Sequence, residues 1–310
     1  MTTFWSWYVT ILTLGTLFML VWLVIGTRKN EQHKNVENKV VGHSFDGIEE
    51  YDNPLPKWWF ILFLLTVVFA LGYLVLYPGL GNWKGIFPGH EGWTGVHQWE
   101  KEMAKAAAKY DPIYAKFAAM PIPEVAQNEQ ALKIGGRLFA SNCAACHGSD
   151  ARGAFGFPNL TDTEWRWGGK PETIKQTILN GREATMPAHG PIIGDKGVHN
   201  VAAYVLTQLA GRKLPEKEKA DIAAGQKIFS TTCFVCHGAD GKGTPSLGAP
   251  NLTNPSAFLY GTSYAQLQQT IRYGRHGQMP AQKDFLGKNR VHVLAAYVYS
   301  LSHPNAKTSK

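Results

Sequence analysis

The sequence is poor in charged residues, in cysteine and in basic runs. Charged residues make up 17% of its 310 residues, below the usual quarter for soluble chains, while apolar residues make up 45%. Four Cys are too few for a disulfide scaffold, and the apolar content argues against disorder. The net charge of +8 comes without basic runs, so nucleic-acid binding is not indicated. These shortages leave a membrane-attached protein with a globular remainder.

The shortage of charge is concentrated in two hydrophobic runs near the N-terminus. Residues 5–25 and 58–77 contain no Asp, Glu, Lys, Arg, His or Cys, and each can cross a hydrocarbon core of about 30 Å as a helix. A cleaved signal peptide is the alternative for the first run, but no Lys or Arg precedes it and no small-residue cleavage site follows it. Without imidazole or thiol ligands, neither helix can hold a haem or copper centre within the bilayer.

The distribution of Lys and Arg predicts how these helices are oriented. Residues 1–4 contain none, the loop 28–57 contains five, and the 20 residues after the second run contain only Lys84. Loops rich in Lys and Arg remain in the cytoplasm. The expected location is therefore a bacterial inner membrane, crossed twice, with both termini and everything after residue 78 in the periplasm.

Residues 130–210 and 220–302 repeat one another in four blocks. The blocks are GGRLFASNCAACHGSDARG (135–153) with GQKIFSTTCFVCHGADGKG (225–243), PNLTD (158–162) with PNLTN (250–254), NGREATMPA (180–188) with YGRHGQMPA (273–281), and VAAYVLTQL (201–209) with LAAYVYSLS (294–302). The offset drifts only from 90 to 93 residues. A period this long predicts one domain for each copy.

Each copy is predicted to be helical with long loops. A short helix carries the Cys, a second helix covers about 171–181 or 263–274, and a last one covers about 197–210 or 289–302. Little in either copy alternates as a strand does. Upstream, residues 97–109 are rich in Ala and predict a helix, and the three prolines that follow are expected to interrupt the connector. These prolines are Pro112, Pro121 and Pro123.

All four Cys lie in two copies of C-x-x-C-H, at Cys143, Cys146 and His147 and at Cys233, Cys236 and His237. Two thiols three positions apart can each add to a vinyl group of one haem, and the adjacent His then reaches the iron, so the pattern predicts c-type haem attachment. A redox dithiol would sit beside a parallel-sheet pattern, and none is visible. A zinc site needs four ligands together, whereas the two pairs lie 90 residues apart.

Met186 and Met279 are the candidates for the second axial ligand. They occupy equivalent places in the copies, and both precede Pro-Ala. A thioether opposite an imidazole leaves iron six-coordinate with a raised potential, which suits electron transfer rather than oxygen or peroxide chemistry. Packing of Met against the porphyrin and ligation by His189 or His276 are alternatives; these two His are not equivalent in position, and both are expected at the surface. Pairing within each copy is the default, and exchange of the two Met between haems stays open.

Three further pairs of residues recur around these ligands. A carbonyl at the proline before Asn-Leu-Thr could orient the axial His, an Arg four residues before each Met could pair with a haem propionate, and a Tyr in each last helix should stack in the haem core. These residues are Pro158 and Pro250, Arg182 and Arg275, and Tyr204 and Tyr297.

The chain as a whole resembles the dihaem cytochrome c subunit (subunit III, the CcoP/FixP family) of cbb3-type cytochrome c oxidase. The resemblance is most specific in HSFDGIEEYDNPLPKWWFILF (43–63), YPGLGNWKG (77–85) and WTGVHQWEKEM (93–103), and it spans residues 1–305. It implies two covalent haems c, a soluble periplasmic cytochrome c as electron donor, and two partners. These are the monohaem cytochrome c subunit and the haem b/copper catalytic subunit, where oxygen is reduced. The chain itself is expected to carry no catalytic residue.

The expected fold is all-α, with two transmembrane helices followed by two tandem class I-like cytochrome c domains. The segments are 1–27 (first span), 28–57 (cytoplasmic loop), 58–77 (second span), 78–129 (connector), 130–213 and 216–305 (the two domains) and 306–310 (tail). A freestanding dihaem shuttle and a dihaem peroxidase are the alternative functions. Glu49, Glu50 and Asp52, just before the second span, could collect protons for a partner, although most such clusters are solvated surface.

Overall fold

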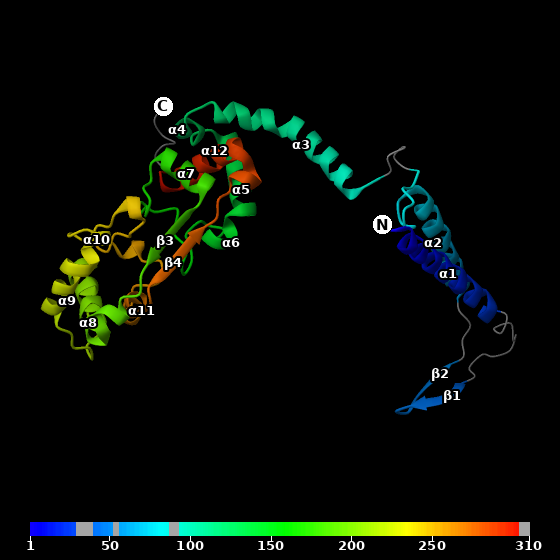
Figure 1. Ribbon diagram of the computed structural model, residues 1–310, viewed down its shortest axis with the longest axis horizontal. Coiled ribbons are helices and arrows are strands. Elements are labelled where there is room, and N and C mark those ends of the chain that lie inside the picture. Colours follow the sequence, from blue (N-terminus) through cyan, green and yellow to red (C-terminus); the bar gives the residue numbers. More distant parts are fainter. Residues whose placement is uncertain (29–39, 52–55, 87–92, 304–310) are drawn as a thin grey trace. The chain divides into compact units, whose positions relative to one another are not determined.

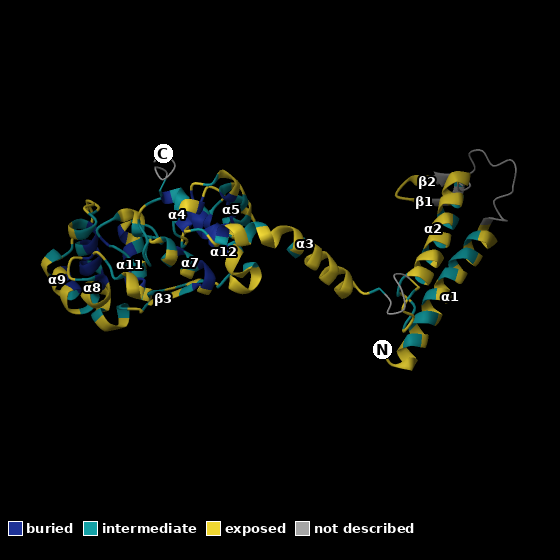
Figure 2. Ribbon diagram, turned by 90° about the horizontal axis from the view of Figure 1, so that it is seen from above, coloured by how far each residue is buried: buried dark blue, intermediate teal, exposed yellow. Residues whose placement is uncertain are grey.

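The computed structural model describes residues 1–28, 40–51, 56–86 and 93–303 (Figure 1). The chain divides into two compact units, Met1–Ala107 and Ala108–Lys310. The described part is mostly helical with little strand, which confirms the predicted all-α class. Dark blue, buried residues in Figure 2 are concentrated in the second unit.

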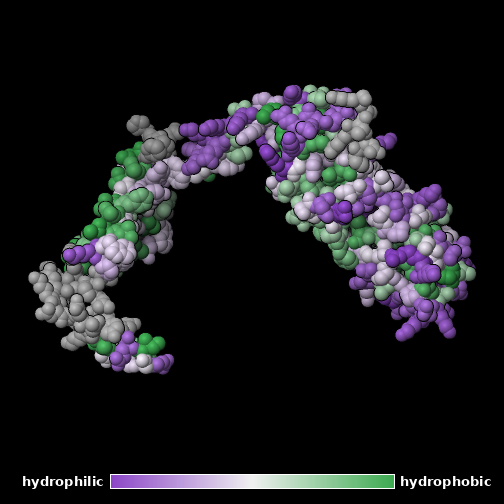
Figure 3. All heavy atoms as spheres, turned by 180° about the vertical axis from the view of Figure 1, so that it is seen from behind, coloured by the Kyte–Doolittle hydropathy of each residue, from purple (hydrophilic) through white to green (hydrophobic). Residues whose placement is uncertain are grey.

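Helices α1 (Thr3–Arg28) and α2 (Lys57–Leu76) of the first unit are the two predicted membrane spans. Both are long and apolar enough to cross a bilayer (Figure 3). Most of their described side chains are exposed and the rest are half-buried (Figure 2). The two helices are antiparallel, because the backbone N–H of Asn82, beyond the end of α2, donates to Ser6 Oγ at 2.9 Å near the start of α1. The N-terminus and the segment after α2 therefore lie at the same end of the pair.

In the sequence between α1 and α2, β1 (Val40–Phe45) and β2 (Ile48–Tyr51) form an antiparallel ribbon. Asp46 and Gly47 form its turn with φ of 51° and 83°, the left-handed pair that favours Asp-Gly at this place. Glu49 is exposed on β2, whereas the side chain of Glu50 and all of Asp52 lie outside the described residues. Their proton-collecting role stays a prediction.

Helix α3 (Gly95–Ala118) is longer than expected, and the prediction that Pro112 interrupts it is wrong. A proline inside a helix removes one backbone hydrogen bond. The Ala-rich sequence before it and the burial of Phe117 after it offset that loss. The other two connector prolines, Pro121 and Pro123, lie at the start of α4 (Ile122–Val125), where a missing N–H costs little.

The rest of the second unit repeats one series of elements twice. The first series is α5 (Glu129–Asn142), α6 (Ala144–His147), α7 (Pro171–Asn180), β3 (Arg182–Met186), α8 (Gly190–Tyr204) and the π-helical turn η2 (Val205–Leu209). The second is α9 (Ile222–Ile228), the π-helical turn η3 (Phe229–Cys233), α10 (Phe234–His237), the 3-10 turns η4 (Pro245–Leu247) and η5 (Pro255–Ala257), α11 (Tyr264–Tyr273), β4 (Arg275–Met279) and α12 (Lys283–Ser302).

The two copies are interleaved through a pair of antiparallel strands, β3 and β4. The register runs from Arg182 opposite Met279 to Met186 opposite Arg275. A five-residue strand extends about 17 Å, so each strand carries the chain past its partner into the other half of the unit. Helix α12 consequently packs on α5 and α7, and α8 packs on α9 and α11 (Figure 1).

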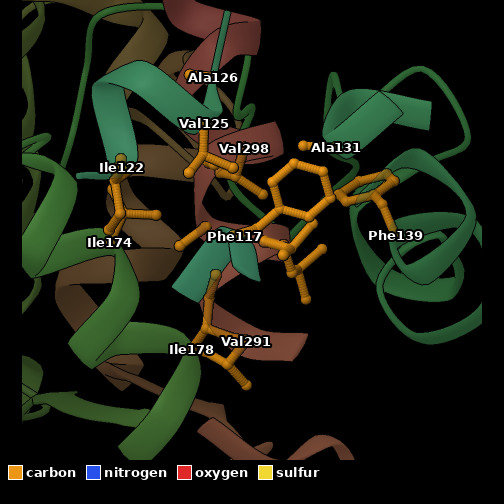
Figure 4. Packing of buried hydrophobic residues seen from close by; sticks show 14 of the residues in the cluster. Phe117, Ile122, Val125, Ala126, Ala131, Phe139, Ile174, Ile178, Val291 and Val298 are labelled. Atoms are coloured by element: carbon orange, nitrogen blue, oxygen red, sulfur yellow. The ribbon is translucent and has the colours of Figure 1, made fainter. Parts of the chain in front are cut away.

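Each hydrophobic core therefore draws on both sequence copies. The first contains α7 of the first copy and α12 of the second, together with Phe117, Ile122 and Val125 of the connector (Figure 4). The second contains α8 of the first copy with η3 and α11 of the second. The expected boundaries, 130–213 and 216–305, mark the repeats, but the last helix of each repeat completes the core of the other.

Candidate haem centres

His147 and His237 are the last residues of the short helices α6 and α10, and both are buried. Each is followed by a glycine with φ near 78°, Gly148 at 79° and Gly238 at 76°, which turns the chain away at once. His147 Nδ1 lies 3.1 Å from the carbonyl oxygen of Pro158, and His237 Nδ1 lies 3.2 Å from that of Pro250.

These carbonyls select one form of the imidazole ring. A carbonyl oxygen can only accept, so Nδ1 must carry the proton, and the lone pair of Nε2 is left for a metal. Burial lowers the pKa of His147, opposed in part by the hydrogen bond to Pro158. Burial also lowers the pKa of His237, opposed by its bond to Pro250, and the charges of Arg166 and His189 lower it further. Both rings are therefore held neutral, as a metal ligand must be.

The four cysteines are free thiols beside these imidazoles. Cys143 and Cys233 are half-buried, while Cys146 and Cys236 are exposed. Burial, with a smaller contribution from the neighbouring Cys, raises the pKa of Cys143 and of Cys233 to about 11. Burial therefore favours the protonated thiol over the thiolate at these two positions.

The two methionines lie in exchanged positions. Met186, from the first copy, lines a cavity of about 490 Å³ together with Cys233, Cys236 and His237 of the second copy. Met279 packs against the first core, as Cys143 also does. This arrangement places Met186 beside the Cys and His of the second copy rather than those of its own copy. The crossing of β3 and β4 produces it. The assignment of each Met to a haem stays a prediction.

One face of the strand pair carries the half-buried residues of both strands. On each strand, the Arg, the middle residue and the Met are half-buried, and the residues between them are exposed. Arg182 and Met279 lie opposite one another at one end of the ribbon, and Arg275 and Met186 at the other. Residues so paired have Cβ atoms about 5 Å apart. Each centre thus receives an Arg from its own copy and a Met from the other.

The two arginines are held in matching ways. Arg182 Nε donates to Thr177 Oγ1 at 2.9 Å, and the guanidinium lies 4.9 Å above the Trp167 ring. Arg275 Nε donates to Thr270 Oγ1 at 3.0 Å, and its guanidinium lies 4.4 Å above the Tyr260 ring. The structure thereby fixes both side chains beside the two centres, and Arg275 lines the second cavity.

Each of the two predicted tyrosines also packs against the other sequence copy. Tyr204 packs on Phe229, with ring centroids 5.5 Å apart, and Tyr297 packs on Phe139 at 5.6 Å. Each Tyr therefore contacts the buried Phe of the other copy. A side chain at Gly135 would collide with Tyr297 Cβ at 2.5 Å, and one at Gly225 would collide with Tyr204 Cβ at 2.9 Å, so glycine is what lets these helices approach so closely.

The expectation that both spare histidines lie at the surface is wrong for one of them. His276 is exposed and pairs with Thr185 Oγ1 at 3.0 Å. His189, however, is half-buried and lines the second cavity. Arg166 of the first copy also lines it, and sequence analysis did not identify that residue. No repeat signal could reveal either one, because the residues 93 positions later are Gln282 and Leu259.

Buried polar atoms without partners test whether a haem fits here. Among the described residues, three such side-chain atoms are Arg275 Nη2, His189 Nδ1 and Trp165 Nε1. Leaving buried N–H groups unpaired is costly. Two of the three residues line the second cavity, and a group that brings carboxylates, as a haem does, would satisfy them. The residues present therefore fit a haem.

An imidazole held by a proline carbonyl after C-x-x-C, with a Met-Pro segment facing it in a small helical core, defines a c-type cytochrome. A family model described as cytochrome c oxidase, cbb3-type, subunit III matches residues 130–205 and 220–298, and the N-terminal domain of cytochrome oxidase-cbb3, FixP, matches residues 37–84. The chain belongs to the family of cbb3-type cytochrome c oxidase subunit III, and its cytochrome c domains imply binding of haem c.

Relatives cover nearly the whole chain. The cbb3-type cytochrome c oxidase subunit CcoP of Rubrivivax gelatinosus is 43% identical over 99% of this chain and 97% of its own length. The subunit FixP of Bradyrhizobium sp. (strain ORS 278) is 40% identical over 84% of this chain and 93% of its own. That of Sinorhizobium medicae (strain WSM419) is 36% identical over 87% and 98%. The family and the two candidate spans together identify an inner-membrane protein.

Proposed function

We propose that this chain is the membrane-anchored dihaem electron-transfer subunit of a cbb3-type haem–copper oxidase. It receives electrons from a soluble periplasmic cytochrome c and delivers them toward a monohaem cytochrome subunit and a haem b/copper subunit that reduces oxygen. The names of the relatives support membership of the oxidase complex. The observation that carries the electron-transfer role is the pair of matching centres, each with a neutral His opposite a Met-bearing strand.

The geometry favours one assignment of ligands to two haems. Cys143, Cys146, His147 and Met279 would hold the first haem. Cys233, Cys236, His237 and Met186 would hold the second. When bound, each haem supplies a one-electron iron couple, whose potential a His/Met pair raises.

The chain's own residues keep these centres closed to other chemistry. Pro158 and Pro250 hold the imidazole rings, and the strand pair carries Met186 into the second cavity and Met279 to the first core. An iron held by both a His and a Met would suit electron transfer rather than oxygen or peroxide chemistry. Arg182 and Arg275 are placed to pair with haem propionates, which neutralises buried charge.

Two features of the membrane part support a periplasmic location for the centres. The antiparallel contact between Ser6 and Asn82 puts the N-terminus and the segment leading to the cytochrome domains at one end of the helix pair. The Lys and Arg of loop 28–57 assign the other end to the cytoplasm. The centres then stand in the periplasm, where haem c is attached and where a soluble donor is found. Exposed apolar side chains of α1 and α2 are available to pack against other membrane subunits.

Purification in a mild detergent tests the proposal. The full-length chain should co-purify with a haem b/copper protein, and a pyridine haemochrome assay with intact mass should give two covalent haems c for each chain. A lone chain with two haems would favour a freestanding shuttle. Free thiols at all four Cys of the mature chain would refute the proposal.

A further inference from the structure

The candidate second haem centre contains a cationic residue that the first sequence copy supplies. Arg166 belongs to the loop after Pro158 in the first copy, yet its side chain lines the second cavity with Cys236 and His237. It is half-buried, and burial lowers its pKa. Arg166 therefore lines the same cavity as the proposed axial ligand, His237.

Arg166 is joined there by two polar groups that lack partners. Arg275 Nη2 and His189 Nδ1 are buried and unsatisfied in the described part of the chain, and both residues line the same cavity. Arg275 cannot turn away, because Thr270 and the Tyr260 ring hold it. The cavity thus gathers two guanidinium groups and an imidazole. Such a set calls for an anion with more than one carboxylate, and haem carries two propionates.

The first centre is not built this way at the equivalent positions. An offset of 93 residues relates Arg182 to Arg275 and Trp167 to Tyr260, and the two Arg make the same contacts in both copies. By the same offset, Arg166 corresponds to Leu259 and His189 to Gln282. The first copy therefore has a cation and an imidazole at these two positions, whereas the second copy has two uncharged side chains.

We propose that Arg166 is a propionate ligand of the second haem, supplied across the repeat boundary by the first copy, and that it gives the second haem the higher potential of the two. This inference rests on the proposed attachment of a haem at Cys233 and Cys236. Reduction of iron removes one positive charge, so a nearby cation favours the reduced state. At equilibrium, a single electron in the chain then resides mainly on the second centre.

Redox titration of the full-length chain with both haems bound tests this. The two spectral components are first assigned with Met186→His and Met279→His, since each lowers the potential of the haem that its Met ligates. Arg166→Leu introduces the residue that the second copy has at this position, Leu259. It should lower the reduction potential of the same spectral component whose potential Met186→His lowers. The expected change in its oxidised-to-reduced ratio is about tenfold, or 59 mV for a one-electron couple. Lys217→Leu, at an exposed loop position, should change neither component.

The results separate this inference from the function it rests on. Two bound haems with no shift in Arg166→Leu, a shift in the other component, or a wild-type second haem of lower potential would each overturn the role of Arg166 and leave the function standing. A wild-type chain without haem at Cys233 and Cys236 would overturn both. If Arg166→Leu accumulates without its full haem content, Arg166→Gln is titrated in its place and carries the same expectation.

Discussion

The two candidate haem centres share the same kinds of candidate ligand but differ in what surrounds them. Both have an imidazole held by a proline carbonyl, a Phe–Tyr pair and a Met from the opposite strand. The first core also contains buried residues of the connector, whereas the second draws its buried residues from the two repeats alone. The second cavity in turn carries Arg166 and His189. The candidate ligands are therefore the same in the two copies, whereas the connector contacts and the charged residues around them differ.

The connector is fastened to the first centre by polar contacts as well. His292 of α12 lies between Lys175 Nζ, at 3.0 Å from Nδ1, and the Met120 carbonyl, at 2.9 Å from Nε2. The ammonium donates to Nδ1, so Nε2–H donates to the carbonyl and the ring is neutral. Burial, together with the Lys175 charge, lowers the pKa of His292 accordingly. The first centre is thereby joined to the segment that leads to the membrane.

The largest effect is expected where the two centres exchange their methionines. In a chain whose first attachment site is removed by Cys143→Ala and Cys146→Ala, Met186→His should lower the potential of the remaining haem by on the order of a few hundred millivolts, because it replaces the thioether. Met279→His in the same background should leave that haem nearly unchanged. Redox titration of the single-haem chains measures both. If Met279→His produced the larger shift, each copy would be using its own Met.

A second test breaks the crossing of the strands. Gly274 has φ of 73°, and a Cβ there would strike the backbone of Met186. Gly211 has φ of 64° with open space around it. Gly211→Ala should cost about 1 kcal/mol of left-handed strain, and Gly274→Ala about 1–3 kcal/mol more. Denaturant unfolding measures the stability, and the Met–iron charge-transfer band should weaken only in Gly274→Ala. Equal losses in the two variants would mean that the approach of the strands is not what requires glycine.

The unequal support of the two cores is tested by removing one buried Phe from each. Phe117→Ala opens a cavity where the connector meets the first core and should cost about 3–5 kcal/mol. Phe229→Ala should cost a similar amount in the second core. Hydrogen exchange followed by mass spectrometry should show faster exchange in α5 and α12 for the first variant and in α8 and α9 for the second. Uniform acceleration in both would show that the unit unfolds as one.

The smallest effect compares two equivalent helix starts. Ser263 caps α11 with a reciprocal capping box to Gln266, whereas Lys170, at the start of α7, makes no side-chain cap. Ser263→Ala should therefore cost about 1 kcal/mol, and Lys170→Ala should stay within about 0.5 kcal/mol. Denaturant midpoints of the two variants measure the difference. A loss for Lys170→Ala as large as that for Ser263→Ala would contradict the cap as its cause.

Local chemistry was readable from the sequence, since it depends on residues near one another in the chain. The C-x-x-C-H spacing, the proline 11 or 13 residues after each His, and the repeat itself lie within single segments. Helix α7, expected at about 171–181, forms at Pro171–Asn180, and α11, expected at about 263–274, forms at Tyr264–Tyr273. Pro112 was misjudged because propensity takes no account of the burial of Phe117.

The partners of Met186, Arg166 and His189 were beyond reach of the sequence because they depend on where the chain crosses. The sequence by itself determined two candidate spans, a duplicated C-x-x-C-H motif and the kinds of candidate ligand, since charge, spacing and repetition are properties of the order of residues. Only the tertiary structure decided which copy completes which hydrophobic core. That choice follows from the antiparallel pairing of two short strands, an interaction between segments about 93 residues apart.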